Sequence, residues 1–209
     1  MHGSHDHVFE GVSEDYRRRL LLVIAINACM FGVEVVAGAL AGSRALQADA
    51  LDFAADAATY GLSLAVIGAS VAIRARAATA KALSLLLMGA WVLGATAWAV
   101  LGTGVPRAEI MGGVGILALA ANVLSVLILA RYRDGDANVR SVWLCSRNDA
   151  IGNVAVMLAA LAVWATASAW PDLIVATAMA GLFLTSSISI LRQALAERGS
   201  GDAHTAHGH

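Results

Sequence analysis

Long apolar runs, separated only by short polar breaks, leave this chain few folds other than a helical bundle in a membrane. A transmembrane helix needs about 20 predominantly apolar residues. Six runs of about that length occupy approximately Leu20–Ala41, Ala45–Ile73, Ala82–Leu101, Ile110–Ala130, Val142–Ala167 and Leu173–Leu195. The second run is longer than a bilayer requires, so we expect its helix to tilt or to extend past one surface.

The composition excludes a soluble domain of this size. Of the 209 residues, 59% are hydrophobic and only 14% are charged, which is well below the charged fraction of soluble domains. We therefore predict an all-α integral membrane protein with a six-helix transmembrane domain over residues 16–198, flanked by His-containing tails at 1–15 and 199–209. The net charge of −1 gives no sign of a nucleic-acid partner.

Basic residues fall almost entirely on one side of the predicted six-span topology. The side that contains both termini carries Arg17, Arg18, Arg19, Arg74, Arg76, Lys81, Arg131, Arg133, Arg140, Arg192 and Arg198. Only Arg44 and Arg107 fall on the opposite side, and Arg147 lies within the fifth span. Because cytoplasmic loops are enriched in Lys and Arg, both termini are predicted to be cytoplasmic. The alanine-rich composition favours a bacterial inner membrane.

Carboxylates within the apolar runs mark a candidate ion site. Asp52 and Asp56 are four residues apart, so on a helix they lie on one face and repel each other. A cation between them would remove the repulsion; alternatively, one of the two stays protonated as a structural hydrogen-bond donor. Asp49 lies nearly on the same face and could be a ligand, a helix-start residue or, as we favour, a group that supports the ligands or gives access to them.

A second pair with the same spacing lies in the fifth run, where Cys145 precedes Asp149 by one helical turn. Cys29, by contrast, has no acidic partner and is interpreted as a small apolar residue. Two facing helices could thus supply four anionic ligands, which suits a tetrahedral ion such as Zn²⁺. The thiolate favours Zn²⁺ or Cd²⁺ over Mg²⁺ and Ca²⁺, which prefer oxygen ligands.

The segment "NACMFGVEVVAGALAGSRALQADALDFAADA" resembles the first two helices of cation diffusion facilitator transporters. The family's Asn, Glu, Gly-x-x-x-Gly-Ser and Ala-Asp-Ala correspond here to Asn27, Glu34, Gly38, Gly42, Ser43 and Ala48–Ala50. The run "GVGILALAANVLSVLIL" resembles the family's fourth helix, with Asn122 in the expected place. The similarity extends from about Leu20 to Leu195.

The family's two metal motifs fall on the acidic pairs. The second-helix motif, His or Asp followed four residues later by Asp, matches Asp52 and Asp56. The fifth-helix motif matches Cys145 and Asp149, often followed by Asn, here Asn153. Cys145 replaces the usual histidine, so the family's ion preference does not transfer. The loop "RYRDGDANVRS" contains no histidine, unlike that of many eukaryotic members. We expect the short form of the family, without its common cytoplasmic domain after the sixth run.

The resemblance implies a transporter, not an enzyme, that exchanges a divalent metal ion for protons by alternating access. Zn²⁺ or Cd²⁺ is expected, with Fe²⁺, Mn²⁺ and Co²⁺ as alternatives. The expected ligands, three of which would also carry protons, are Asp52, Asp56, Cys145 and Asp149. The residues expected to support them or to give access are Asp49, Asn148, Asn153, Asn27 and Glu34. We expect a homodimer that forms through the membrane helices.

Histidines cluster at both ends of the chain, at His2, His5, His7, His204, His207 and His209. They could capture metal weakly near the cytoplasmic entrance, or they could belong to solvated tails without a role. Arg147 could pair with Glu34 or extend toward the membrane surface, and the sequence leaves both open. An intramembrane enzyme is disfavoured because no Gly-x-Gly-Asp motif lies within the six apolar runs and the acidic pairs sit four residues apart on one helix. A metal-binding sensor or accessory subunit that does not transport remains an alternative.

Overall fold

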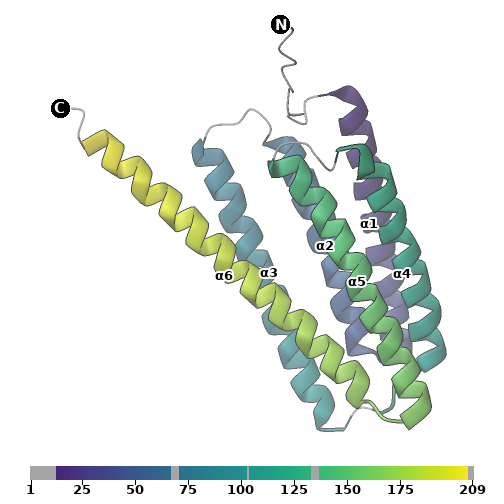
Figure 1. The fold of residues 1–209 in the computed structure, drawn as a ribbon. Helices are drawn as coiled ribbons and strands as arrows, with labels where there is room; N and C mark the ends of the chain where they lie inside the picture. Colours follow the sequence, from purple (N-terminus) through teal and green to yellow (C-terminus); the bar gives the residue numbers. More distant parts are fainter. Residues whose placement is uncertain (1–12, 67–70, 103, 133–136, 207–209) are drawn as a thin grey trace, which may run out of the picture.

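The computed structural model describes residues 13–66, 71–102, 104–132 and 137–206, the side chains of 71–72, 137–141 and 194–206 excepted. Within these ranges the chain forms six α-helices and one short 3-10 helix. They are α1 (Glu14–Ala41), α2 (Arg44–Ala65), α3 (Val71–Val100), α4 (Ala108–Leu129), η1 (Ala130–Tyr132), α5 (Ala137–Thr166) and α6 (Trp170–Ala206). The start of α1 and the end of α6 lie at the same end of the bundle (Figure 1).

Several of the predicted helix boundaries are wrong, most clearly the end of the second helix, the start of the third and the end of the sixth. The second helix was expected to reach Ile73, but α2 ends at Ala65 and α3 already begins at Val71. The stretch "RARAATAK", predicted as a break between spans, is therefore helical. Its Ala, Arg and Lys residues are good helix formers and it contains no Gly or Pro, so low hydropathy alone does not end the helix. At the other end of the chain, α6 continues past Leu195 to Ala206.

Among the described residues, five helices are long and apolar enough to cross a membrane: Glu14–Ala41, Ile73–Val100, Ala108–Tyr132, Val142–Thr166 and Trp170–Gln193. The remaining helix, α2, contains an arginine and three aspartates. The outward faces of the other helices carry large exposed apolar side chains, including Leu87, Leu127, Leu158 and Ile174. Such surfaces fit lipid rather than water, and the chain is a multi-pass membrane protein.

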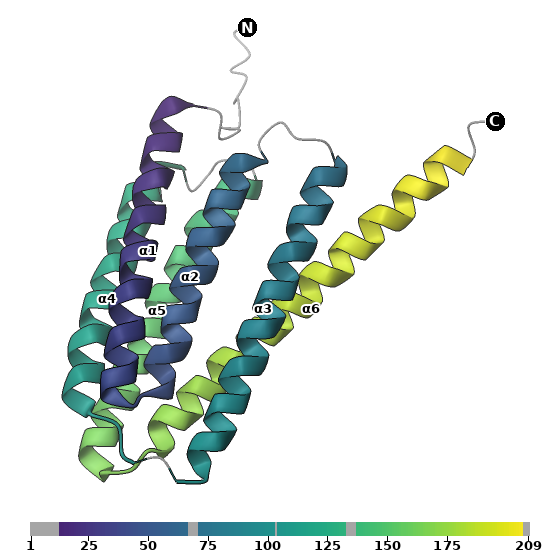
Figure 2. The ribbon, with the colours of Figure 1, turned by 180° about the vertical axis from the view of Figure 1, so that it is seen from behind.

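The helices form two groups. Helices α1, α2, α4 and α5 stand together as one group, and α3 pairs with α6 beside it (Figures 1 and 2). The close approach of α3 and α6 depends on Gly89, because a Cβ atom there would lie 2.9 Å from Cγ of Leu184 and 3.2 Å from the carbonyl oxygen of Ala180. The α3–α6 pair meets the other group at the end where α6 begins and diverges from it toward the opposite end.

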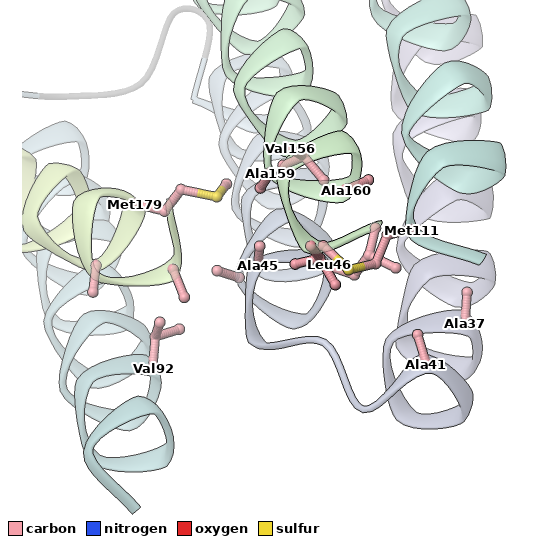
Figure 3. Close-up of a cluster of buried hydrophobic side chains, with 14 of the residues drawn as sticks. Ala37, Ala41, Ala45, Leu46, Val92, Met111, Val156, Ala159, Ala160 and Met179 are labelled. Carbon is pink, nitrogen blue, oxygen red and sulfur yellow. The ribbon is translucent and has the colours of Figure 1, made fainter. Parts of the chain in front are cut away.

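A buried apolar cluster fills the end where the two groups meet. It includes Ala45 and Leu46 of α2, Val92 of α3, Val156 of α5 and Met179 of α6. Figure 3 shows side chains of both groups converging there. We call this end of the bundle the narrow end, and the end where α1 begins and α6 ends the wide end. Apolar packing therefore holds the two groups together at the narrow end.

A polar contact reinforces the same end. Gly42 has a positive φ of 69° and ends α1, and Ser43 then starts α2 by accepting a hydrogen bond from the amide of Leu46 at 3.0 Å. Asp172 of α6, only 1% exposed, accepts hydrogen bonds from the Ser43 hydroxyl at 2.6 Å and from the amides of Arg44 at 2.8 Å and Ala45 at 3.0 Å. This set of three bonds, the Asp172 clasp, satisfies free amides at the start of α2 and joins that helix to α6.

Replacing Asp172 with Ala should lower the free energy of unfolding by about 2–3 kcal/mol, because three buried donors lose a charged acceptor. Asp172→Asn, which keeps one acceptor oxygen, should cost less. Thermal unfolding of the purified protein in detergent measures both. Glu109→Ala is the matched control, since Glu109 is an exposed acid in the first turn of α4. Equal unfolding temperatures for Asp172→Ala and the control would contradict a stabilising clasp.

Candidate metal centre

A cavity of about 440 Å³ lies between α2, α3, α5 and α6. Its wall contains all four predicted ligands: Asp52 and Asp56 from α2, and Cys145 and Asp149 from α5. Each helix contributes its pair because residues four apart lie one turn above each other on the same face. The structure thus brings residues that are about 90 positions apart into one polar space within an apolar bundle.

Asp149 occupies the centre of the acidic group. Its carboxyl group lies within hydrogen-bonding reach of both Asp52 and Asp56. Two carboxyl groups can form a hydrogen bond only when one of them carries a proton. Within the described residues, no N–H or O–H group donates to the buried Oδ2 atom of Asp149. The geometry therefore provides places for protons between the carboxyl groups.

Tyr60 orients the second aspartate of α2. Its hydroxyl group donates a hydrogen bond to Oδ2 of Asp56, one turn earlier on the same helix, and lies 3.4 Å from the hydroxyl of Ser146 on α5. The Tyr60 ring is completely buried. Sequence reasoning missed this residue, although its spacing of four from Asp56 could have indicated it.

The four predicted ligands share a cavity but do not surround a single point. In this conformation the described residues include no group of three or more His, Cys, Asp or Glu side chains that could hold a metal ion. The carboxyl groups face one another instead, and Asp56 is held by Tyr60. Metal–oxygen contacts of about 2.0–2.2 Å to several ligands would thus require the side chains to rotate toward a common centre.

Lys81 is the cavity residue whose position the sequence interpretation misjudged. It was predicted to lie in a break between spans, but it belongs to α3 and lines the cavity with Leu85 one turn later. Thr59, Ser186 and Ser189 add hydroxyl groups to the same wall. Reading "RARAATAK" as helical would have placed Lys81 on the face of Leu85, but only the packing of α3 against α6 shows that this face borders the aspartates.

The residues predicted to support the ligands or give access to them divide into two sets. Asn148 lines the cavity. Glu34 and Asp49 are buried between α1 and α2, where their carboxyl groups lie within hydrogen-bonding reach of each other. Asn27 and Asn153 are also buried, and within the described residues their side-chain amides have no hydrogen-bond partner. These four lie in the bundle interior outside the cavity wall.

Arg147 does not pair with Glu34. Its side chain is exposed, donates a hydrogen bond to Oδ1 of Asn148 at 3.3 Å, and lies over the ring of Trp143 at 5.6 Å. The stacking holds the guanidinium group on the outer face of α5, away from Asp149. Of the two alternatives for Arg147, this position excludes the pair with Glu34.

Five of the six terminal histidines lie outside the described residues: His2, His5, His7, His207 and His209. The backbone of His204 belongs to α6, but its side chain is also outside the described part. Metal capture by these residues stays a prediction.

The cavity has an apolar side and a polar side. Leu85, Met179 and Phe183 belong to the apolar cluster of the narrow end. Because α6 runs from the narrow end to the wide end, Ser186 and Ser189 lie nearer the wide end than Met179 and Phe183 do. Apolar packing and the Asp172 clasp thus close the cavity on one side, while its polar wall faces the other.

The family model of the cation efflux transmembrane domain matches residues 20–197, which is most of the chain. No curated protein gives a significant match to the sequence. The chain therefore belongs to the cation diffusion facilitator family of cation efflux transporters.

Proposed function

We propose that this protein exports Zn²⁺ or Cd²⁺ in exchange for protons by alternating access. The observation that carries the proposal is the convergence of Asp52, Asp56, Cys145 and Asp149 on one cavity in a bundle of membrane helices. Cation efflux is the activity of the family. The ion, the exchange and the ligands are inferred from the chemistry of these side chains.

The mixed oxygen and sulfur donors support the choice of ion. Zn²⁺ accepts carboxylate and thiolate ligands in a tetrahedral shell, and soft thiolate ligands favour Zn²⁺ and Cd²⁺ over hard ions. Fe²⁺, Mn²⁺ and Co²⁺ are the alternatives, because carboxylates can bind them as well. Asn148 also lines the cavity, although in this conformation its side-chain oxygen accepts a hydrogen bond from Arg147.

Buried carboxyl groups support proton exchange. An empty site with three carboxylates and one thiolate would hold about four negative charges, a cost that burial does not allow. Protons between Asp149 and its two neighbours would lower that charge. Metal binding requires deprotonated ligands and therefore releases protons, so an inward proton gradient could reload the site and expel the ion.

The basic residues support the proposed orientation. The positive-inside rule places both termini in the cytoplasm, so the wide end and the polar side of the cavity would face the cytoplasm. In that arrangement α2 also spans the membrane and brings the number of spans to six. Its aspartates are then turned to the bundle interior rather than to lipid. A bacterial inner membrane and a homodimer formed through membrane helices complete the proposal.

Asp149→Asn should reduce metal transport by more than about 100-fold, since loss of groups that only support a metal ligand already costs about 10–100-fold. Zn²⁺ and Cd²⁺ flux into proteoliposomes under an imposed pH gradient measures the effect. Glu109→Gln is the control, because Glu109 is an exposed acid outside the cavity. Wild-type flux in Asp149→Asn would reject the site. Binding without flux in the wild type would instead favour a metal sensor or accessory subunit.

Cys145→His should retain Zn²⁺ transport and lower the Cd²⁺/Zn²⁺ flux ratio, because imidazole suits Zn²⁺ and is a harder ligand than thiolate. The ratio is measured in the same proteoliposomes with both ions present. Cys29→Ser, a change at an exposed cysteine on α1, controls for general effects of thiol removal. An unchanged ratio in Cys145→His would show that Cys145 does not bind the ion.

A further inference from the structure

Lys81 places a positive charge in a cavity that is proposed to bind a cation. It lines the wall together with Asp52, Asp56, Cys145 and Asp149, and it comes from α3, on the opposite side of the cavity from α5. Its ammonium group acts electrostatically on the Asp56 carboxyl group and the Cys145 thiol group. In the described part of the chain, the ion pairs closer than 4.0 Å involve only Arg18, Arg19 and Arg131, so Lys81 is not held in a fixed pair.

The position of Lys81 along the bundle is also informative. Asp56 follows Asp52 in α2, which runs toward the wide end, and Cys145 precedes Asp149 in α5, which starts from it. Asp56 and Cys145 are thus the two ligands nearer the wide end, and they are the two on which Lys81 acts. An ion that enters from the wide end meets Lys81 before it reaches the deeper carboxyl groups.

A lysine side chain suits a temporary counter-charge. Its ammonium group is a compact point charge on a flexible four-carbon stem, so it can approach the carboxylates when the site is empty and withdraw when a divalent ion arrives. While it stays near, its repulsion weakens metal binding. At separations of several ångströms inside a protein, one unit charge changes the affinity for a divalent ion by about tenfold or more.

We propose, on the basis of the function proposed above, that Lys81 is a tethered counter-cation of the metal site. It partly neutralises the empty site, is displaced when the ion binds, and lowers the affinity so that the ion can be released. Protons and Lys81 then share the task of compensating the ligand charge. If Lys81 contributed only the packing of its aliphatic stem against Leu85, removing its charge while keeping the stem would leave the metal affinity unchanged.

The test compares Lys81→Met, which keeps the length of the stem and removes the charge, with Lys81→Arg, which keeps the charge. Zn²⁺ binding to the full chain in nanodiscs is measured by titration calorimetry, and Zn²⁺ flux is measured in proteoliposomes. Lys81→Met should bind Zn²⁺ about tenfold more tightly or more, with a lower KM and a lower maximal flux. Lys81→Arg should remain close to the wild type, as should Arg76→Met, which removes an exposed charge from the same helix.

The outcomes separate the role of Lys81 from the proposed function. If the wild type binds and transports Zn²⁺ and Asp149→Asn does not, but Lys81→Met has wild-type affinity, the counter-cation is rejected and the transporter stands. If the wild type neither binds nor transports Zn²⁺ or Cd²⁺, both proposals fail. Should Lys81→Met not insert into membranes, Lys81→Gln makes the same comparison with a polar, uncharged side chain.

Discussion

A carboxylate in an apolar interior must be compensated by a proton, a cation or strong hydrogen bonds, and this bundle uses two different solutions. Asp172 receives three hydrogen bonds from the start of α2, so fixed donors compensate it and its role is structural. Asp52, Asp56 and Asp149 face one another instead. Their charge would have to be compensated by protons or a bound cation, which is what the proposed exchange of metal ions for protons requires.

The helical architecture and most of the site could be predicted from local patterns. Run length indicated the six helices, although not the end of α2 or the start of α3. The spacing of four placed Asp52 with Asp56 and Cys145 with Asp149, because helical periodicity is a local property. Lys81 and the partners of Asp172 depend on how distant helices pack. Asp172 bonds to residues 127–129 positions away, a contact that no pattern along the chain encodes.

The division into two helix groups explains why the cavity lies where it does. Gly89 lets α3 and α6 pack closely as a pair, and the remaining four helices form the other group. The cavity lies between the two groups, so each side of it comes from a different group: α2 and α5 contribute the proposed ligands, whereas α3 and α6 contribute Lys81 and the serines.

The Asp172 clasp joins α6 to the start of α2 at the narrow end. A rotation of α6 about this point would therefore move the part of α6 near the wide end the most. From Asp172 to Ser189, α6 rises about 25 Å at 1.5 Å per residue. A rotation of about 10° about the clasp would therefore displace Ser189 by about 4 Å while barely stretching the three hydrogen bonds. Through the contact at Gly89, α3 would follow α6. A small change of angle at this joint would thus change the width of the cavity mouth, although the joint lies far from the proposed metal ligands.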